Sequence, residues 1–277
     1  MKALFCSLNN IGFVNPLIGL AHQLTDMSVK SYFLTDPFMH SYLRTQQLEY
    51  IKEKKPAFLI RRFHEPELVS NQVNAIERAI LTLQPDVLVV SPNILGAPIA
   101  AERHNIPLVT MGFLSYLWET EQTSECTSPQ MLEVYRWRTK EMFTLYNNVR
   151  KHLGLVALKK DNANLPFVGS LHLQRSVKGF SERLNTLPSQ VVQSGSCLWE
   201  ADINTKDNDD LLQWLSEPAQ ANKTVIFVNH GRTFGMPSFW NEVKACFSNS
   251  DFVVLANVGR MDEDVGEIPK NFFVRPY

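Results

Sequence analysis

Two polar turns follow predicted strands and carry side chains that can bind a ligand. Asn9 and Asn10 follow a short apolar run near the amino terminus. The turn Asn229–Thr233, which contains Arg232, follows the apolar run Thr224–Val228. Open α/β sheets bind ligands at the carboxyl ends of their strands, where arginine can contact a phosphate and asparagine can hydrogen-bond a hydroxyl. Two plainer interpretations stay open, with Arg232 as a solvated loop charge and the asparagines as turn formers.

The signatures of metal, redox and dinucleotide chemistry are missing from the sequence. The segment His64-Glu65-Pro66 lacks a second histidine at helical spacing, and its proline would break the helix that a zinc motif needs. The four cysteines contain no C-x-x-C pair, which argues against a zinc ribbon and a thioredoxin-type site. No G-x-G-x-x-G follows the first strand, which disfavours a dehydrogenase. We therefore expect no metal and no resident cofactor.

Composition and charge are those of an ordinary globular protein. The 277 residues are 44% hydrophobic and 20% charged, which is enough for a large core in one or two domains. A net charge of -1 gives no overall field that attracts nucleic acid or an anionic membrane. The sequence has neither a secretory apolar segment at its start nor a run near the ~18 apolar residues of a membrane span. These features favour a cytoplasmic protein, with peripheral membrane contact left open.

Strand and helix patterns alternate along the chain. Unbroken apolar runs such as residues 86–90 are typical of strands buried on both faces, and segments with helical spacing separate them. This alternation predicts an α/β fold with a doubly wound parallel sheet. Asn15 and Pro16 are expected to be the N-cap and first residue of the first helix. We expect an N-terminal domain over residues 1–190 and a partial second Rossmann-like domain over residues 191–277.

Four segments resemble those of a known family. They are the Asn-Pro and Leu-Ala helix start at residues 12–24, the strands Gln-Pro-Asp-Val-Leu-Val-Val and Ile-Pro-Leu-Val within residues 84–109, the entry into the second domain at residues 192–231, and the last ten residues, 268–277. The combination resembles the UDP-glycosyltransferase-like superfamily, family one of the GT-B-fold glycosyltransferases. It implies two facing Rossmann-like domains, the first binding an acceptor and the second a nucleotide-sugar. It also implies a chain truncated before the family's donor-binding signature.

The same resemblance assigns the site residues. In the family, a histidine after the first strand takes the acceptor's proton, and an aspartate near the end of a later strand orients it. Phe13 and Ser91 hold these positions here, so the usual catalytic pair is absent, because a benzyl ring cannot accept a proton. Phe13 is expected either to line an apolar pocket or to pack against the first helix. The implied acceptor site contains Asn9, Asn10, Gly12, Phe13, Phe113 and Tyr116, and the implied donor site contains His230, Gly231, Arg232 and Thr233.

The resemblance predicts an inverting transfer of a sugar from a UDP- or dTDP-linked donor to a hydroxyl of a small, hydrophobic natural product. Activity would then need an acidic acceptor hydroxyl, a different base or a partner. The alternatives are an inactive remnant, an acceptor-binding half that needs a complementary donor-domain subunit, and another enzyme of this architecture such as a sugar-nucleotide epimerase. A homodimer is a further alternative, because the last predicted strand, residues 272–274, leaves an edge with unpaired backbone groups.

Overall fold

The computed structural model forms two compact units, Met1–Ala201 and Asp202–Tyr277. In the helix over residues 129–152, the structure describes the backbone but not the side chains of residues 131, 132, 134–139 and 142. No helix in the described ranges is both long and apolar enough to cross a membrane. The structure describes residues 1–53, 56–59, 65–91, 93–113, 128–159, 167–176, 189–197, 199, 209–217, 219–229, 238–248, 250–258 and 265–275.

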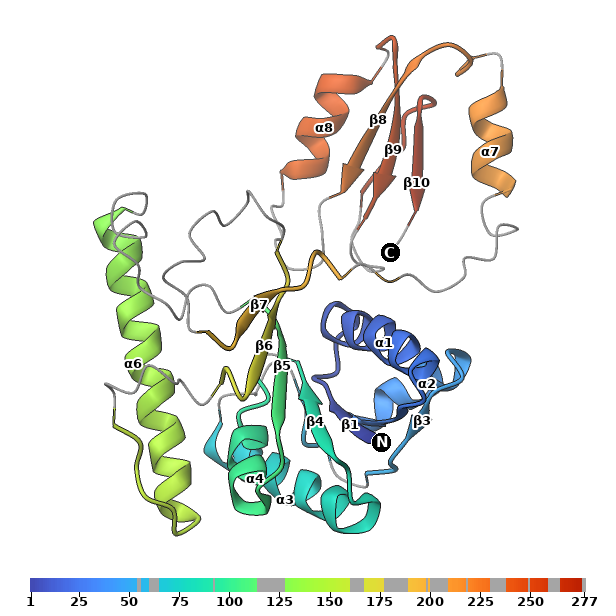
Figure 1. Cartoon of the computed structure of the whole chain (residues 1–277). Helices are drawn as coiled ribbons and strands as arrows, with labels where there is room; N and C mark the ends of the chain where they lie inside the picture. Colours follow the sequence, from blue (N-terminus) through green and yellow to red (C-terminus); the bar gives the residue numbers. More distant parts are fainter. Residues whose placement is uncertain are drawn as a thin grey trace. The chain divides into compact units, whose positions relative to one another are not determined.

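The first unit is built on a seven-stranded parallel sheet with the order β3-β2-β1-β4-β5-β6-β7 (Figure 1). Ala3 of the first strand pairs with Ser31 on one side and with Val87 on the other, so the strand order reverses at the first strand. The doubly wound sheet predicted from the sequence is confirmed. Its strands are β1 Lys2–Cys6, β2 Lys30–Leu34, β3 Glu49–Tyr50, β4 Val87–Val90, β5 Leu108–Gly112, β6 Leu171–Gln174 and β7 Val191–Gln193.

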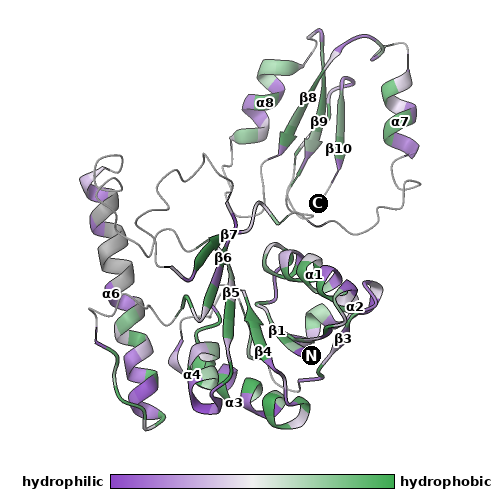
Figure 2. Ribbon diagram, viewed as in Figure 1, coloured by the Kyte–Doolittle hydropathy of each residue, from purple (hydrophilic) through white to green (hydrophobic). Residues whose placement is uncertain are grey.

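Helices cover both faces of this sheet, and each face has its own apolar core. Leu4 and Cys6 of β1 point into one core, while Ala3 and Phe5 point into the other, because successive side chains of a strand alternate in direction. Figure 2 shows the strands mostly in the hydrophobic colour, as expected for strands covered on both faces. The helices of this unit are α1 Ile11–Asp26, the 3-10 turn η1 Pro37–Met39, α2 His40–Thr45, α3 Pro66–Leu83, α4 Gly96–His104 and α6 Pro129–His152.

Two of these helices, α3 and α4, approach closely because α4 begins at a glycine. A Cβ atom at Gly96 would lie 2.6 Å from Cβ of Gln72 and 2.8 Å from the backbone nitrogen of Val73. The side-chain oxygen of Gln72 accepts a hydrogen bond from the Gly96 N–H at 3.0 Å, which satisfies one free donor of the first turn of α4. This contact holds the helices that cover one face of β1 and β4.

Helix α1 begins earlier than the sequence predicted. The N-cap is Asn10, whose side chain accepts a hydrogen bond from the Gly12 N–H at 2.9 Å, and Pro16 lies inside the helix. The expectation that Asn15 and Pro16 start the helix was therefore wrong. Asn15 instead accepts a hydrogen bond from the Tyr42 hydroxyl at 2.8 Å, which joins α1 to α2.

The second unit contains a three-stranded parallel sheet with the order β10-β9-β8. Trp240, Val254, Ala256 and Phe272 form most of its core. Strand β7 pairs with β6 in the first sheet, so the division of the structure falls after residue 201 and beyond the boundary expected at residue 190. The elements of the second unit are α7 Asp209–Ser216, β8 Thr224–Asn229, α8 Phe239–Phe247, β9 Phe252–Asn257 and β10 Phe272–Arg275.

Candidate functional site

The carboxyl ends of β1, β4, β5 and β6 meet at one edge of the first sheet, because all of its strands are parallel. The strand order reverses between β1 and β4, and open α/β sheets bind ligands beside such a switch point. We call this side of the unit the carboxyl edge. The residues that follow its strands include Asn9, Asn10, Gly12, Ser91 and Phe113.

The two asparagines have structural roles at the carboxyl edge. The side-chain oxygen of Asn10 caps α1, and the backbone N–H of Asn9 donates to the Phe58 carbonyl at 2.9 Å. Both residues are half-buried. The side-chain amide group of Asn10 can still donate to a ligand when its oxygen serves as the cap. A contact between either asparagine and an acceptor stays a prediction.

Neither residue at the positions of the family's catalytic pair can remove a proton from a ligand. The Phe13 ring is half-buried and packs against the core on the α3 and α4 face of the sheet. Ser91 is 1% exposed, and its hydroxyl oxygen accepts a hydrogen bond from the Leu8 N–H at 3.3 Å. Ser91 therefore joins the ends of β1 and β4 beneath the edge, where a ligand does not reach it.

Arg175, which the sequence did not single out, lies at the carboxyl edge directly after β6. Its Nη1 donates to the Gly12 carbonyl at 3.4 Å, and its Nε donates to the Ser196 carbonyl at 3.1 Å. Its guanidinium carbon stands 4.9 Å from the ring centroid of Phe113. Burial lowers the pKa of Arg175, and the Cys197 thiol opposes this shift. Arginine nevertheless stays protonated in proteins, so this part of the edge carries a positive charge.

One sequence signal could have pointed to a partner for the Gly12 carbonyl. In an α-helix, the carbonyl of residue 12 accepts from the N–H of residue 16, but Pro16 has no N–H. The Gly12 carbonyl is therefore left without its helical donor, and Arg175 supplies one from 163 residues further along the chain. The sequence shows the missing donor but does not show which residue replaces it.

A buried polar network lies under the same edge. His172 on β6 is fully buried, with its Nδ1 2.6 Å from Oγ1 of Thr110 and its Nε2 3.0 Å from Oε1 of Gln174. Burial lowers the pKa of His172, while the hydrogen bonds that the imidazole donates to Gln174 and to the Gly112 backbone oppose the shift. The lowered pKa favours the neutral imidazole. It fixes the ends of β5 and β6 just before Phe113 and Arg175.

Several predicted site residues lie outside the described part of the chain. They include Tyr116 on the acceptor side. Phe113, by contrast, is described and is 54% exposed. On the donor side, the description of β8 ends at Asn229, just before the predicted turn. The acceptor and donor assignments therefore stay predictions, the donor ones being His230, Gly231, Arg232 and Thr233.

Solved structures with the same fold are glycosyltransferases. The glycosyltransferase of kitacinnamycin matches with a TM-score of 0.71 and 16% identity over 99% of this chain and 70% of that chain. The spinosyn forosaminyltransferase SpnP matches with a TM-score of 0.67 and 16% identity over 100% of this chain and 70% of that chain. VinC in complex with dTDP matches with a TM-score of 0.58 and 14% identity over 99% of this chain and 71% of that chain.

The chain has the GT-B fold. The resemblance that the sequence indicated is therefore confirmed at the level of the fold. No protein-family model matches the sequence, and no curated protein matches it.

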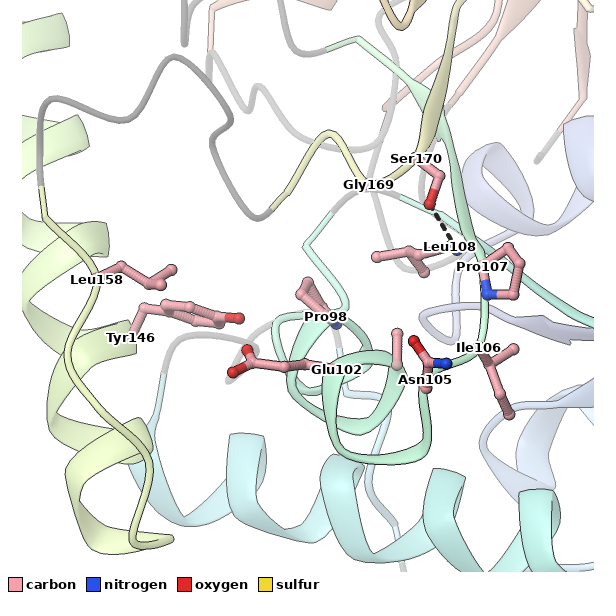
Figure 3. Close-up of a pocket in the computed structure, with 11 residues that line it drawn as sticks. Pro98, Glu102, Asn105, Ile106, Pro107, Leu108, Tyr146, Leu158, Gly169 and Ser170 are labelled. Carbon is pink, nitrogen blue, oxygen red and sulfur yellow. Dashed lines mark hydrogen bonds between the residues drawn. The ribbon is translucent and has the colours of Figure 1, made fainter.

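A pocket of about 630 Å³ lies at the amino-terminal ends of the strands of the first sheet, on the side opposite to the carboxyl edge (Figure 3). The pocket lies at the starts of β5 and β6, where Pro107 and Ser170 line it together with residues of α4 and Tyr146 of α6. In Figure 3, the Tyr146 side chain extends from α6 toward Pro98 of α4. None of the predicted acceptor residues lines this pocket. Because open sheets bind ligands at the carboxyl ends of their strands, the candidate site is the carboxyl edge.

The described residues contain no group of three His, Cys, Asp or Glu side chains that could hold a metal ion. At the carboxyl edge, the described residues offer an arginine, an exposed aromatic ring and polar backbone groups. Such a surface can hold an aromatic or apolar molecule with a polar or anionic group.

Proposed function

We propose that the protein transfers a sugar from a UDP- or dTDP-linked donor to a small apolar molecule held at the carboxyl edge. The observation that carries this proposal is the fold shared with natural-product glycosyltransferases along 99% or more of the chain. A fold alone does not determine chemistry, so the proposal also depends on what the carboxyl edge offers a ligand.

The carboxyl edge offers an acceptor both apolar and polar contacts. Phe113 presents an exposed aromatic ring, which supports an acceptor with an aromatic or aliphatic body. Asn9 and Asn10 would supply hydrogen bonds to its polar groups. In this proposal the acceptor oxygen displaces the nucleoside diphosphate directly from the anomeric carbon, which inverts that centre.

The donor would bind to the second unit, at the carboxyl ends of its strands. One solved neighbour is a complex with dTDP, which supports a nucleoside diphosphate as part of the donor. Strand β8 leads into the turn with His230, Gly231, Arg232 and Thr233, and Arg232 would contact a phosphate there. Charge-assisted contacts of this kind stabilise the departing diphosphate.

A second candidate function follows from Phe13 and Ser91. Since neither residue can act as a base, the chain would instead bind an acceptor without transferring sugar to it, or would work with a complementary donor-domain subunit. This candidate predicts that acceptor binding occurs in the absence of any nucleotide binding.

Calorimetric titration of the chain with UDP, dTDP and GDP separates these functions. The transferase proposal predicts saturable heat with at least one nucleotide. If a folded monomer gives no heat with any of them, the chain is not an autonomous transferase. Acceptor binding under those conditions would support the second candidate.

A further inference from the structure

Arg175 is a partly exposed cation whose hydrogen bonds leave donors free. A guanidinium group has five N–H donors, and the carbonyl groups of Gly12 and Ser196 take one each. No carboxylate among the described residues forms an ion pair with Arg175. A partly buried cation without an anion beside it loses part of its favourable hydration energy. A bound anion would compensate for that loss.

Three parts of the first unit fix the guanidinium in this place. Nη1 is held by the Gly12 carbonyl, which Pro16 leaves without a helical donor, and Nε is held by the Ser196 carbonyl. The guanidinium also lies against the Phe113 ring. Contact with an aromatic ring leaves N–H groups available for hydrogen bonds to a ligand. Arg175 is thus a positioned anion receptor that contacts Gly12, the residue before Phe13 at the family's base position.

We infer that Arg175 binds an anionic oxygen of the acceptor, a carboxylate or the phenolate of an acidic phenol, and that this oxygen is the nucleophile. This inference rests on the proposed function and names its substrate class. It explains how the carboxyl edge could support transfer without a base at Phe13 or Ser91, because an oxygen that is already ionised has no proton to lose.

The reaction balances without a proton acceptor. The anionic oxygen forms a bond to the anomeric carbon while the bond from that carbon to the diphosphate breaks. The nucleoside diphosphate leaves with the electron pair and the negative charge that the acceptor brought. With a carboxylate the product is a glycosyl ester, and with a phenolate it is an aryl glycoside. Arg175 orients the oxygen and keeps it ionised.

The diphosphate of the donor is the other anion that could reach a guanidinium. The acceptor is favoured because Arg175 belongs to the first unit and touches the exposed Phe113 ring, which suits an aromatic acid rather than a phosphate. Separate titrations with an aromatic acid and with UDP therefore distinguish the acceptor from the donor diphosphate as the anion that Arg175 binds.

The test measures binding of naphthoate, its uncharged amide and UDP to the full chain by ligand-observed NMR at low ionic strength. The variants are Arg175→Gln, which removes the charge, and Arg175→Lys, which keeps the charge but loses the planar fork. Arg44→Gln is the matched control, because it removes one exposed charge from α2, where Arg44 donates to the Tyr50 hydroxyl. Circular dichroism verifies that each variant is folded.

We expect naphthoate to bind the unmodified chain at least about tenfold more tightly than its amide, as for a charge-assisted hydrogen bond. Arg175→Gln should abolish this preference, Arg175→Lys should retain part of it, and Arg44→Gln should leave it unchanged. Equal binding of acid and amide, no binding of either, or a preference that survives Arg175→Gln would overturn the inference. The inference would also be overturned if the unmodified chain shows no preference for the acid while Arg175→Gln loses UDP binding. That result would assign Arg175 to the donor site.

These outcomes are independent of the proposed transfer, because naphthoate binding requires no nucleotide. If the chain prefers the acid but binds no nucleotide, the anion site is supported and the transferase proposal is contradicted. If the chain binds nucleotide but shows no preference for the acid, the anion site is contradicted and the transferase proposal is still supported.

Discussion

Replacing Ser91 with alanine tests the structural role of the residue at the family's aspartate position. The Ser91 hydroxyl accepts from the Leu8 N–H at 3.3 Å, and both residues are almost fully buried. Alanine removes the acceptor and leaves a buried N–H without a partner, which costs about 1–3 kcal/mol. Because the hydrogen bond is long, we expect about 1–2 kcal/mol of lost stability in the first unit.

Urea unfolding followed by circular dichroism measures this loss, and Ser70→Ala provides the control. With a slope of about 2 kcal/mol per molar urea, the Ser91→Ala midpoint should fall by roughly 0.5–1 M. Ser70 donates to the Pro66 carbonyl on the exposed surface of α3, where water can replace it, so its loss should cost less than about 0.5 kcal/mol. Equal midpoints for the two variants would refute the role given to Ser91.

Three further predictions address packing, catalysis and pH. Gly96→Ala should destabilise the first unit by at least about 1–3 kcal/mol, since its Cβ would meet Gln72 at 2.6 Å, and an unchanged urea midpoint would contradict the packing. Phe13→His should raise transfer to an alcohol acceptor about a hundredfold by supplying a base, and an unchanged rate by mass spectrometry would mean that Phe13 lies away from the nucleophile. Hydrogen bonding to Arg150 lowers the pKa of Glu102, so this pair stabilises the fold above the ordinary glutamate pKa of 4.5 and loses that effect as pH falls below it. Glu102→Gln should flatten this acid dependence of urea unfolding, and an unchanged slope would contradict the assignment.

The sequence predicted the sheet well because its strands are buried on both faces. Their apolar runs stand out without any alternation, and sharp stops such as Gln84-Pro85 mark where helices end. In the structure, Gln84 is the left-handed C-cap of α3, and β4 begins at Val87. The domain boundary was less predictable, because only pairing with β6 shows that β7 belongs to the first sheet.

The start of α1 shows why local rules failed at the candidate site. Asn15 followed by Pro16 has the pattern of a helix start, but Asn10 is the cap, and the helix continues through the proline. The helix tolerates Pro16 there in part because Arg175, the residue that follows β6, donates to the Gly12 carbonyl. A contact across 163 residues cannot be inferred from local spacing.

The sequence predicts which residues hold the family's catalytic positions, but it could not predict their surroundings. The sequence left open whether Phe13 lines a pocket or packs in the fold, and in the structure it packs against the core while staying partly exposed. Ser91 could be recognised as unable to replace an aspartate, whereas its bond to Leu8 required the three-dimensional fold.

Sugar transfer itself is tested most directly by incubating the chain with UDP- and dTDP-sugars and an aromatic carboxylic acid, then quantifying products by mass spectrometry. We predict that glycosylated acid and free nucleoside diphosphate form in equal amounts. Neither product should form with Arg175→Gln at the same acceptor concentration. Absence of both products with every donor and with a range of acids and acidic phenols, from a folded chain, would contradict the proposed transfer.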